Sequence, residues 1–270
     1  MAAIESTVGF PTPGVRVQRL RAALGTWVAI EAAASTEKRA LAGLEAAYLA
    51  VFEIGRRLHP YGEASELARV HAAFPHTQVP IAASTWELLR LARRVHALSE
   101  GIFDPCLPCR PGRLCDLVLS APGTDSPWVL CKVPLALDLG GIAKGYAIDV
   151  AIEALRAAGC GGGLVNAGGD LRVYGRSESV LLRYSDGNCA PVTLKEQALA
   201  VSDLDADVAQ RPPEHRDYYR RSGANDPVRR YAAVVAPSAA VADALTKCVL
   251  LAEERCAARA LRAFGARQIG

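Results

Sequence analysis

The chain has 270 residues, of which 51% are hydrophobic and 22% are charged, so it can bury a substantial core and is not intrinsically disordered over most of its length. The net charge of +3, the aromatic share of 6% and the lack of any Lys or Arg run longer than two argue against nucleic acid as a main partner. Because there is no apolar stretch of about 18 residues and no signal-peptide pattern at the N-terminus, we expect no membrane insertion, no export, and reduced cysteines in a cytoplasm.

The first part of the chain predicts one strand followed by two helices. A strand that enters through Gly25 is expected over 19–31. Apolar residues recur at close to the 3.6-residue period over 36–58, which predicts an amphipathic helix. A second helix is expected from Ser84, where Ser84-Thr85-Trp86-Glu87 has the pattern of a capping box, to about Gly101.

The middle of the chain predicts a loop, a strand, a helix and a further pair of strands. Pro, Gly and Cys are dense over 106–126, which is typical of an irregular segment. The sequence VPLALDL at 133–139 predicts a short buried strand, and 142–158 predicts a helix that ends at a glycine. Residues 164–174 are expected to form two strand pieces broken by a glycine pair.

The last part of the chain alternates between polar and apolar segments. Residues 202–230 are polar and are expected to form a long mobile loop. A strand is predicted over 231–236, followed by a helix that Ser238 caps and that runs to about Leu251. Another helix is expected from about 254 to 264.

Strands and helices alternate irregularly along the chain. This pattern favours an α+β fold, with mixed or antiparallel sheets flanked by helices, over a doubly wound sheet. We expect an N-terminal extension over 1–18 and a single domain over 19–270.

The segment LDLGGIAKGYAID, at 137–149, is the strongest candidate for a binding site. A strand end, a glycine pair and a helix start present unpaired backbone N–H groups, and the helix dipole favours an anion there. Lys144 lies in the first helical turn, where the dipole disfavours a cation, so a bound phosphate would explain its position. The alternative is a tight turn with a solvated lysine, and the residues alone leave both interpretations open.

Two other patterns have both a functional and a structural interpretation. Gly168-Gly169 before Asp170 indicates either the close approach of a ligand or a β-bulge. Asp243 and Lys247 lie four residues apart on one face of a predicted helix, but an exposed pair of this kind contributes only about 0.3 to 0.5 kcal/mol.

Three cysteines in the predicted loop, Cys106, Cys109 and Cys115, could begin a zinc or iron–sulfur site. No fourth ligand stands at a suitable spacing, and Cys131 is sixteen residues further on. Loop cysteines packed under proline are therefore the favoured interpretation. The chain also lacks a Walker motif and a G-x-S-x-G elbow, which sets aside P-loop NTPases and α/β-hydrolases.

Several short segments occur in a characteristic order over about 20–251. They are ALGT at 23–26, Tyr61 with SELAR at 65–69, GIFDP at 101–105, the LDLGGIAKGYAID stretch, NAGGD at 166–170 and VVAPSAAVADAL at 234–245. In this order they resemble the ApbE family of FAD:protein FMN transferases. The resemblance implies an ApbE-like (T-fold-like) core and an enzyme that uses FAD and Mg2+. Such an enzyme moves FMN onto a Thr or Ser hydroxyl of a target flavoprotein and releases AMP.

The resemblance also implies which residues form the site. Those expected around FAD are Tyr61, Phe103, Asp104, Lys144, Asp149, Gly168 and Gly169. Lys144 is expected near the adenosine or pyrophosphate part. The Mg2+ ligands are expected to be the Gly141 carbonyl, the Asp243 carboxylate and the Thr246 hydroxyl. Asp243 is also expected to be catalytic, with His215 as a candidate general base.

Two departures from the family concern the expected metal ligands and the expected general base. A Thr or Ser usually stands four residues after the metal-binding Asp, whereas here that residue is Lys247. A protonated lysine has no lone pair for Mg2+, so its ammonium could replace the ion and pair with Asp243, or Thr246 could supply the hydroxyl. The family segment His-x-x-Asp-Pro-x-Thr-Gly also matches 215–223 poorly, so a surface histidine in a polar loop is the favoured interpretation of His215 over a general base.

Three hypotheses from different classes follow. The first is a cytoplasmic FMN transferase that acts on FAD and an acceptor flavoprotein. The second is a non-catalytic binder of FAD or another flavin nucleotide on the same fold, with Lys247 replacing the metal. The third, which the residues favour least, is a cysteine-ligated metal protein.

Overall fold

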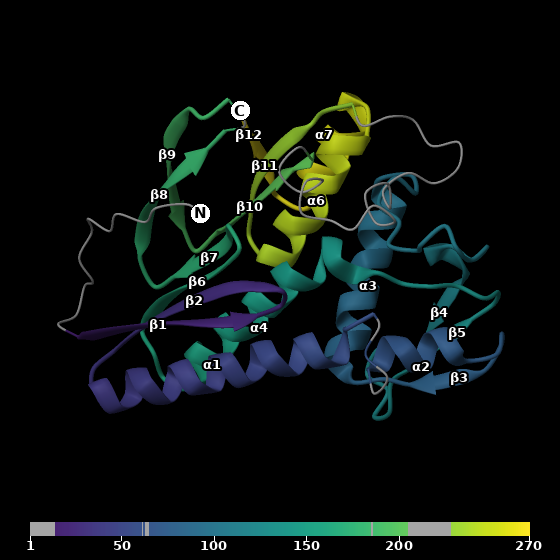
Figure 1. Ribbon diagram of the computed structural model, residues 1–270, viewed down its shortest axis with the longest axis horizontal. Helices are drawn as coiled ribbons and strands as arrows, with labels where there is room; N and C mark the ends of the chain where they lie inside the picture. Colours follow the sequence, from purple (N-terminus) through teal and green to yellow (C-terminus); the bar gives the residue numbers. More distant parts are fainter. Residues whose placement is uncertain (1–13, 61, 63–64, 185, 205–227) are drawn as a thin grey trace.

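The computed structural model describes residues 14–60, 62, 65–184, 186–204 and 228–270. Within these residues the strands form a seven-stranded sheet, a three-stranded sheet and a two-stranded hairpin, and the paired strands are antiparallel. Helices flank the sheets (Figure 1). The expected α+β class is therefore confirmed.

The seven-stranded sheet is the centre of the fold. Its order is β1-β2-β6-β7-β10-β11-β12. The bounds of these strands are β1 Val15–Ala23, β2 Thr26–Ala34, β6 Gly162–Ala167, β7 Asp170–Tyr174, β10 Ala198–Asp203, β11 Tyr231–Ala236 and β12 Arg267–Ile269. Strand β1 begins inside the segment that the sequence analysis treated as an N-terminal extension.

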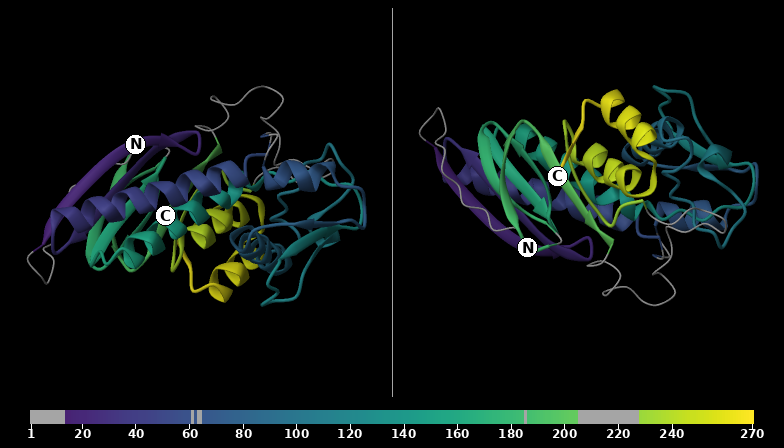
Figure 2. Two further views of the ribbon diagram at one scale, coloured as in Figure 1. Left: turned by 90° about the horizontal axis from the view of Figure 1, so that it is seen from below. Right: turned by 90° about the horizontal axis from the view of Figure 1, so that it is seen from above.

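One face of this sheet is covered by three helices, α1 (Glu37–Arg57), α4 (Ala143–Ala157) and α6 (Ala239–Leu251). In the left view of Figure 2 the long helix α1 lies in front of the strands of this sheet. The main hydrophobic core lies between these helices and the sheet, and its largest fully buried side chain is Tyr48 on α1. The helices α4 and α6 pack directly against each other.

A smaller core lies on the opposite face of the sheet. There the hairpin of β8 (Ser177–Arg183) and β9 (Cys189–Lys195) packs its alternate apolar residues on those of β6, β7, β10 and β11. Strand β11 is buried on both faces because its successive residues point alternately into the two cores. The sequence analysis did not identify β8, β9, β10 or β12.

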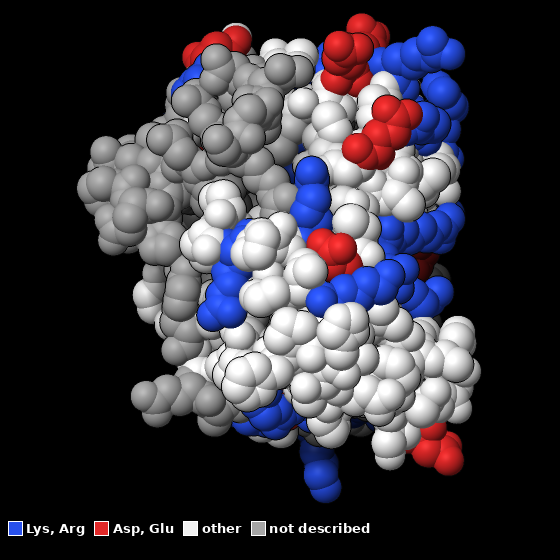
Figure 3. Space-filling model, turned by 90° about the vertical axis from the view of Figure 1, so that its right-hand side faces the viewer, with Lys and Arg blue, Asp and Glu red and all other residues white. Residues whose placement is uncertain are grey.

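The remaining elements are α2 (Glu66–Ala72), α3 (Ala83–Leu98), α7 (Glu254–Ala263), the short 3-10 helices η1 (Leu114–Asp116) and η2 (Leu139–Gly141), and the sheet of β3 (Gln78–Pro80), β5 (Trp128–Cys131) and β4 (Leu117–Leu119). Of these elements, α2, α3, β3, β4 and β5 lie in the right-hand part of the molecule in Figure 1, and α7 lies beside α6. The face in Figure 3 carries Lys and Arg along its right margin and across its middle, with acidic side chains among them, and its lower part is mostly uncharged.

Four predicted elements were wrong, and α2, β3 and β5 were not predicted. The segment 106–126 is not irregular throughout, because it contains η1 and β4. The segment 19–31 is a hairpin instead of one strand, because Leu24 and Gly25 both take positive φ (55° and 72°) and close a two-residue turn. Helix α3 begins at Ala83 and has no side-chain cap, so Ser84 does not form the expected capping box. Residues 133–138 form no strand and contribute only the isolated bridge between Leu137 and Cys106.

Other elements match their predictions. The helices α1, α4, α6 and α7 lie within one or two residues of the expected bounds, as do the strands β6, β7 and β11. The side chains of Thr36 and Ser238 cap α1 and α6.

Two expected site residues, Tyr61 and His215, lie outside the described residues, as does 205–227 of the expected loop. Of the helices in the described ranges, none has the length and hydrophobicity needed to span a bilayer.

Candidate functional site

Two lysine–aspartate pairs lie together where α4, β7 and α6 meet. The ammonium of Lys144 in the first turn of α4 pairs with the carboxylate of Asp170 at the start of β7. On α6, Lys247 follows Asp243 by one helical turn, and Lys247 Nζ lies 2.6 Å from Asp243 Oδ1. The two carboxylate side chains are only 2% and 1% exposed, whereas Lys144 is 29% exposed. Two positive and two negative groups make the cluster neutral.

The close packing of α4 on α6 explains where Asp243 lies. Gly145 has no side chain at the helix contact, and a Cβ there would lie 2.2 Å from the Ala239 carbonyl oxygen. The helices therefore approach closely enough for Gly145 N–H to donate to Asp243 Oδ2 at 3.2 Å. A carboxylate of the protein itself thus occupies the N-terminal turn of α4, where the helix dipole favours negative charge.

The two carboxylates respond differently to the same surroundings. Burial raises the pKa of Asp170, the negative Asp243 nearby raises it further, and Lys144 offsets this only in part. Burial also opposes ionisation of Asp243, but Lys247 and Lys144, together with the Gly145 N–H, hold its pKa below the ordinary value. Asp243 is therefore the more firmly ionised of the pair.

A buried hydroxyl pair completes the contacts of Lys247. The side chains of Ser202 on β10 and Thr246 on α6 lie 2.8 Å apart, and Lys247 Nζ donates to Ser202 Oγ at 3.0 Å. The Thr246 hydroxyl also donates to the backbone carbonyl of Asp243 at 2.7 Å. The sequence analysis missed Ser202 because it lies more than 40 residues from its partners and belongs to no motif.

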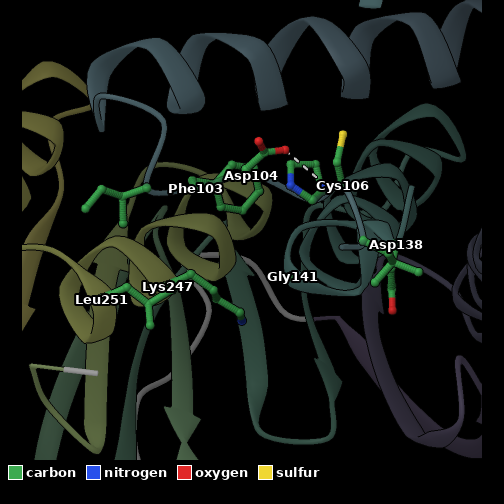
Figure 4. A pocket seen from close by; sticks show the side chains of 10 residues that line it. Phe103, Asp104, Cys106, Asp138, Gly141, Lys247 and Leu251 are labelled. Atoms are coloured by element: carbon green, nitrogen blue, oxygen red, sulfur yellow. Dashed lines mark hydrogen bonds between the residues drawn. The ribbon is translucent and has the colours of Figure 1, made fainter. Parts of the chain in front are cut away.

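Two cavities adjoin this cluster, and Asp138 lines both of them. The smaller has a volume of about 50 Å³ and is bordered by Gly141 and Lys247. Figure 4 shows the Lys247 side chain extending from α6 toward the loop at Gly141, with Phe103 and Asp104 on another wall. The larger has a volume of about 530 Å³ and is lined by Ala23, Leu24, Gly25, Val51, Phe52, Ile54, Gly55, Arg56, Leu58, His59, Pro60, Asp138, Gly140, Ala143 and Lys144.

Asp138, which lines both cavities, is held in place by backbone contacts. Its Oδ1 accepts from Gly140 N at 2.8 Å, which caps η2, and its N–H donates to the Pro105 carbonyl at 2.9 Å. The preceding N–H, of Leu137, donates to His71 Nε2 at 2.7 Å. Burial and the positive Arg110 lower the pKa of His71, so the neutral ring that can accept this hydrogen bond is favoured.

Several expected FAD residues have structural partners within the described part of the chain. Asp104 accepts from the N–H groups of Cys106 (3.1 Å) and Leu114 (3.3 Å), and so organises the loop wall of the smaller cavity. Asp149 accepts from Ala239 N and Ala240 N, both at 2.9 Å, and pairs with Arg172 Nη1 at 2.7 Å. Asp149 on α4 therefore caps α6.

The glycine pair forms a turn between β6 and β7. Gly168 and Gly169 both have positive φ (64° and 107°), and the last paired residues are Ala167 and Asp170. This is a two-residue hairpin turn instead of the bulge that the sequence left open. Because β7 begins directly after this turn, the turn positions Asp170, the partner of Lys144, at the start of the strand.

The residues expected to hold Mg2+ do not fit that ion. Mg2+ requires about six oxygen ligands at roughly 2.0 to 2.1 Å. Here the Lys247 ammonium lies against Asp243 Oδ1, and its side chain passes so close to Gly141 that a Cβ there would be 3.3 Å from Lys247 Cε. Thr246 is fully buried, and its hydroxyl already forms hydrogen bonds with Ser202 and with the Asp243 carbonyl. A cation is already present at this position, as part of the chain.

The three loop cysteines do not form a metal site. Cys106 is buried, whereas Cys109 and Cys115 are exposed. Among the residues that the structure describes, no three His, Cys, Asp or Glu side chains come close enough together to hold a metal ion. The hypothesis of a zinc or iron–sulfur site at these cysteines is therefore contradicted.

Comparison with known proteins identifies the family. Similar solved structures include the flavin transferase ApbE from Vibrio cholerae (TM-score 0.75, 19% identity, 95% of this chain and 93% of that chain covered), the apo form of the flavinyl transferase ApbE from Pseudomonas stutzeri (0.76, 20%, 94% and 90%) and the ApbE protein from Thermotoga maritima (0.75, 21%, 94% and 93%). No curated protein matches the chain. The sequence model of the ApbE family matches residues 24–268, and the chain therefore belongs to the ApbE family.

Proposed function

We propose that the protein is an FAD:protein FMN transferase, which moves FMN from FAD onto a Thr or Ser hydroxyl of an acceptor flavoprotein and releases AMP. The observation that carries this proposal is the pair of cavities that share Asp138 as a lining residue, one bordered by Lys144 in the first turn of α4 and the other by Lys247. Family membership and the flavin transferases among the similar structures support it.

The larger cavity has the size and lining expected for one end of a dinucleotide. Its volume of about 530 Å³ lies within the range of small-molecule sites, about 300 to 1,000 Å³. Leu24, Val51 and Phe52 provide apolar surface for a ring system, and Lys144 provides a positive group in the same lining. We therefore place one ring system of FAD here, with the pyrophosphate toward Asp138 and Lys144.

The proposed reaction exchanges one phosphate bond for another. The acceptor hydroxyl oxygen bonds to the flavin-side phosphorus, the bond from that phosphorus to the bridging oxygen breaks, and AMP leaves with the bridging oxygen. The hydroxyl proton passes to a base, for which His215 stays a prediction. Phosphoryl transfer depends mainly on positioning and charge neutralisation, which Lys144 and Lys247 would supply.

Other residues would act by holding these groups in position. Asp149 ties α4 to the start of α6 and so sets the distance between Lys144 and Lys247. Asp170 holds Lys144 at the edge of the cavity, and its hydrogen bond from Val201 N (3.0 Å) anchors it to β10. His71 fixes the backbone that precedes Asp138.

One observation favours the second candidate, a flavin-nucleotide binder without transfer activity. Lys247 engages the carboxylate of Asp243, the residue that the family resemblance marks as catalytic. The cluster would then contribute no net charge to a transition state that gathers negative charge.

A single assay separates the two candidates. Purified protein is incubated with FAD and a Thr-containing acceptor domain, in EDTA and in Mg2+; binding of FAD is measured by fluorescence anisotropy, and AMP and covalently bound flavin are quantified. Equal amounts of both products support the transferase. FAD binding with neither product supports the binder, and a failure to bind FAD in either buffer rejects both.

A further inference from the structure

We propose that the Lys247 ammonium takes the place of a divalent cation at Asp243, so that the protein binds the pyrophosphate of its dinucleotide substrate without a metal ion. This inference rests on the proposed FAD site. It adds that the positive charge facing the phosphates on the α6 side is covalently part of the chain.

The position of the ammonium is the first argument. Nζ lies 2.6 Å from Asp243 Oδ1 and 3.0 Å from Ser202 Oγ, and the aliphatic part of the side chain passes Gly141. Gly141, Asp243 and Thr246 are the residues that the family resemblance assigns to the metal. The ammonium therefore fills the space that these three groups would otherwise leave for an ion.

The charge balance is the second argument. The charges of Lys144 with Asp170, and of Lys247 with Asp243, already sum to zero, and both carboxylates are buried. A divalent ion at Asp243 would stand next to the Lys247 ammonium, and at such short range in a poorly solvated site the repulsion is strong. Removal of the lysine would leave the buried carboxylate of Asp243 without its ion-pair partner, which favours the binding of a metal ion there.

The remaining donor capacity of Lys247 is the third argument. Within the described residues, Asp243 and Ser202 accept two of its three N–H groups, and the side chain borders the smaller cavity next to Gly141 and Asp138. Lysine binds phosphate as a point charge, so the third N–H can meet a phosphate oxygen placed in that cavity. One charge in place of two also predicts weaker neutralisation than a metal ion would provide.

The first experiment measures FAD binding by fluorescence anisotropy in EDTA and in Mg2+. For the unmodified protein we expect the two Kd values to agree within about twofold. For Lys247→Thr we expect weaker binding in EDTA and a recovery of about tenfold or more in Mg2+. Lys195→Thr is the matched control, because Lys195 is exposed on β9, on the opposite face of the central sheet, and should behave as the unmodified protein does.

The second experiment does not depend on FAD or on the stability of a variant. Binding of Mn2+ alone to the unmodified protein is measured from the electron paramagnetic resonance signal of the free ion, with Asp243→Asn as the reference for ions bound elsewhere. We expect the two proteins to bind the same amount of Mn2+. Lys247→Thr, with folding checked by circular dichroism, should bind one ion more per chain than the unmodified protein.

The outcomes separate the inference from the function on which it rests. FAD binding that requires Mg2+ in the unmodified protein overturns the role of Lys247, as does an Mn2+ ion that is lost in Asp243→Asn. If FAD does not bind in either buffer, the proposed function fails, and the Mn2+ measurement alone then decides whether Lys247 excludes a metal ion from Asp243.

Discussion

Replacement of Gly145 by alanine tests whether the close contact between α4 and α6 sets the geometry of the site. The added Cβ would lie 2.2 Å from the Ala239 carbonyl oxygen and 2.8 Å from Ala240 Cα. Carbon–oxygen contacts normally begin at about 3.3 Å, so one helix has to move by about 1 Å. The atoms in the way belong to the backbone and cannot rotate aside.

The expected cost follows from opposing contributions. Alanine is better than glycine in a helix by about 1 kcal/mol, which favours the variant. Overpacking costs about 1 to 3 kcal/mol. Separation of the helices also weakens the hydrogen bonds from Gly145 N–H to Asp243 and from the start of α6 to Asp149, each worth about 1 kcal/mol. We expect a net loss of about 2 to 4 kcal/mol in the free energy of unfolding.

The measurement is urea denaturation followed by circular dichroism, with Gly55→Ala as the control. Gly55 also lies in a helix, α1, but its added Cβ would meet only the tip of the Leu24 side chain, at 3.1 Å. We expect this variant to be neutral or more stable by up to about 1 kcal/mol. The reasoning is refuted if Gly145→Ala is as stable as the unmodified protein, since the helix contact would then be loose.

Three further predictions concern single side chains around the site. His71→Leu removes the acceptor of the Leu137 N–H and should lower the free energy of unfolding by about 1 to 3 kcal/mol above neutral pH. Because the folded-state pKa of His71 is lowered, the stability that the neutral ring supplies is lost as pH falls below about 6.5. The urea denaturation curves of the two proteins should therefore converge in acid, and a difference that stays constant with pH would contradict this. Asp149→Asn should lower the free energy of unfolding by about 1 to 3 kcal/mol, because the single oxygen of an amide cannot accept from both backbone N–H groups of α6 and from Arg172. An unchanged midpoint of urea denaturation would show that α6 does not need this cap. Lys144→Met leaves the carboxylate of Asp170 buried without its ammonium partner and should lower the free energy of unfolding by about 3 kcal/mol. Since burial raises the pKa of Asp170, the folded state binds a proton more tightly than the unfolded state, and this loss of stability should shrink as pH falls. A loss of stability that grows in acid would refute the pairing of Lys144 with Asp170.

Local signals in the sequence predicted α1, α4, α6 and α7 to within one or two residues. Thr36 and Ser238 accept hydrogen bonds from the first turns of α1 and α6, as short polar side chains at these positions do. The glycine pair before Asp170 predicted the break between β6 and β7. Each of these features depends on residues that are close together in the chain, so a short window contains the physical cause.

Strand pairing was predicted less well because its causes are not local. The turn at Leu24 and Gly25 was missed because leucine rarely takes a positive φ, so 19–31 was interpreted as one strand. The segment 133–139 has an apolar sequence, but the β3-β5-β4 sheet takes Trp128–Cys131 in its place. The β8-β9 hairpin was missed because its alternating residues become a core only against the central sheet.

The sequence by itself determined the family, the helical frame and the position of Lys247 one turn after Asp243, because an i, i+4 pair on a helix needs no information from elsewhere in the chain. Only the tertiary structure decided that Asp170 is the anion that compensates Lys144, and that Ser202 supports Lys247. These partners come from different strands of the central sheet, and burial there makes each charge require the other.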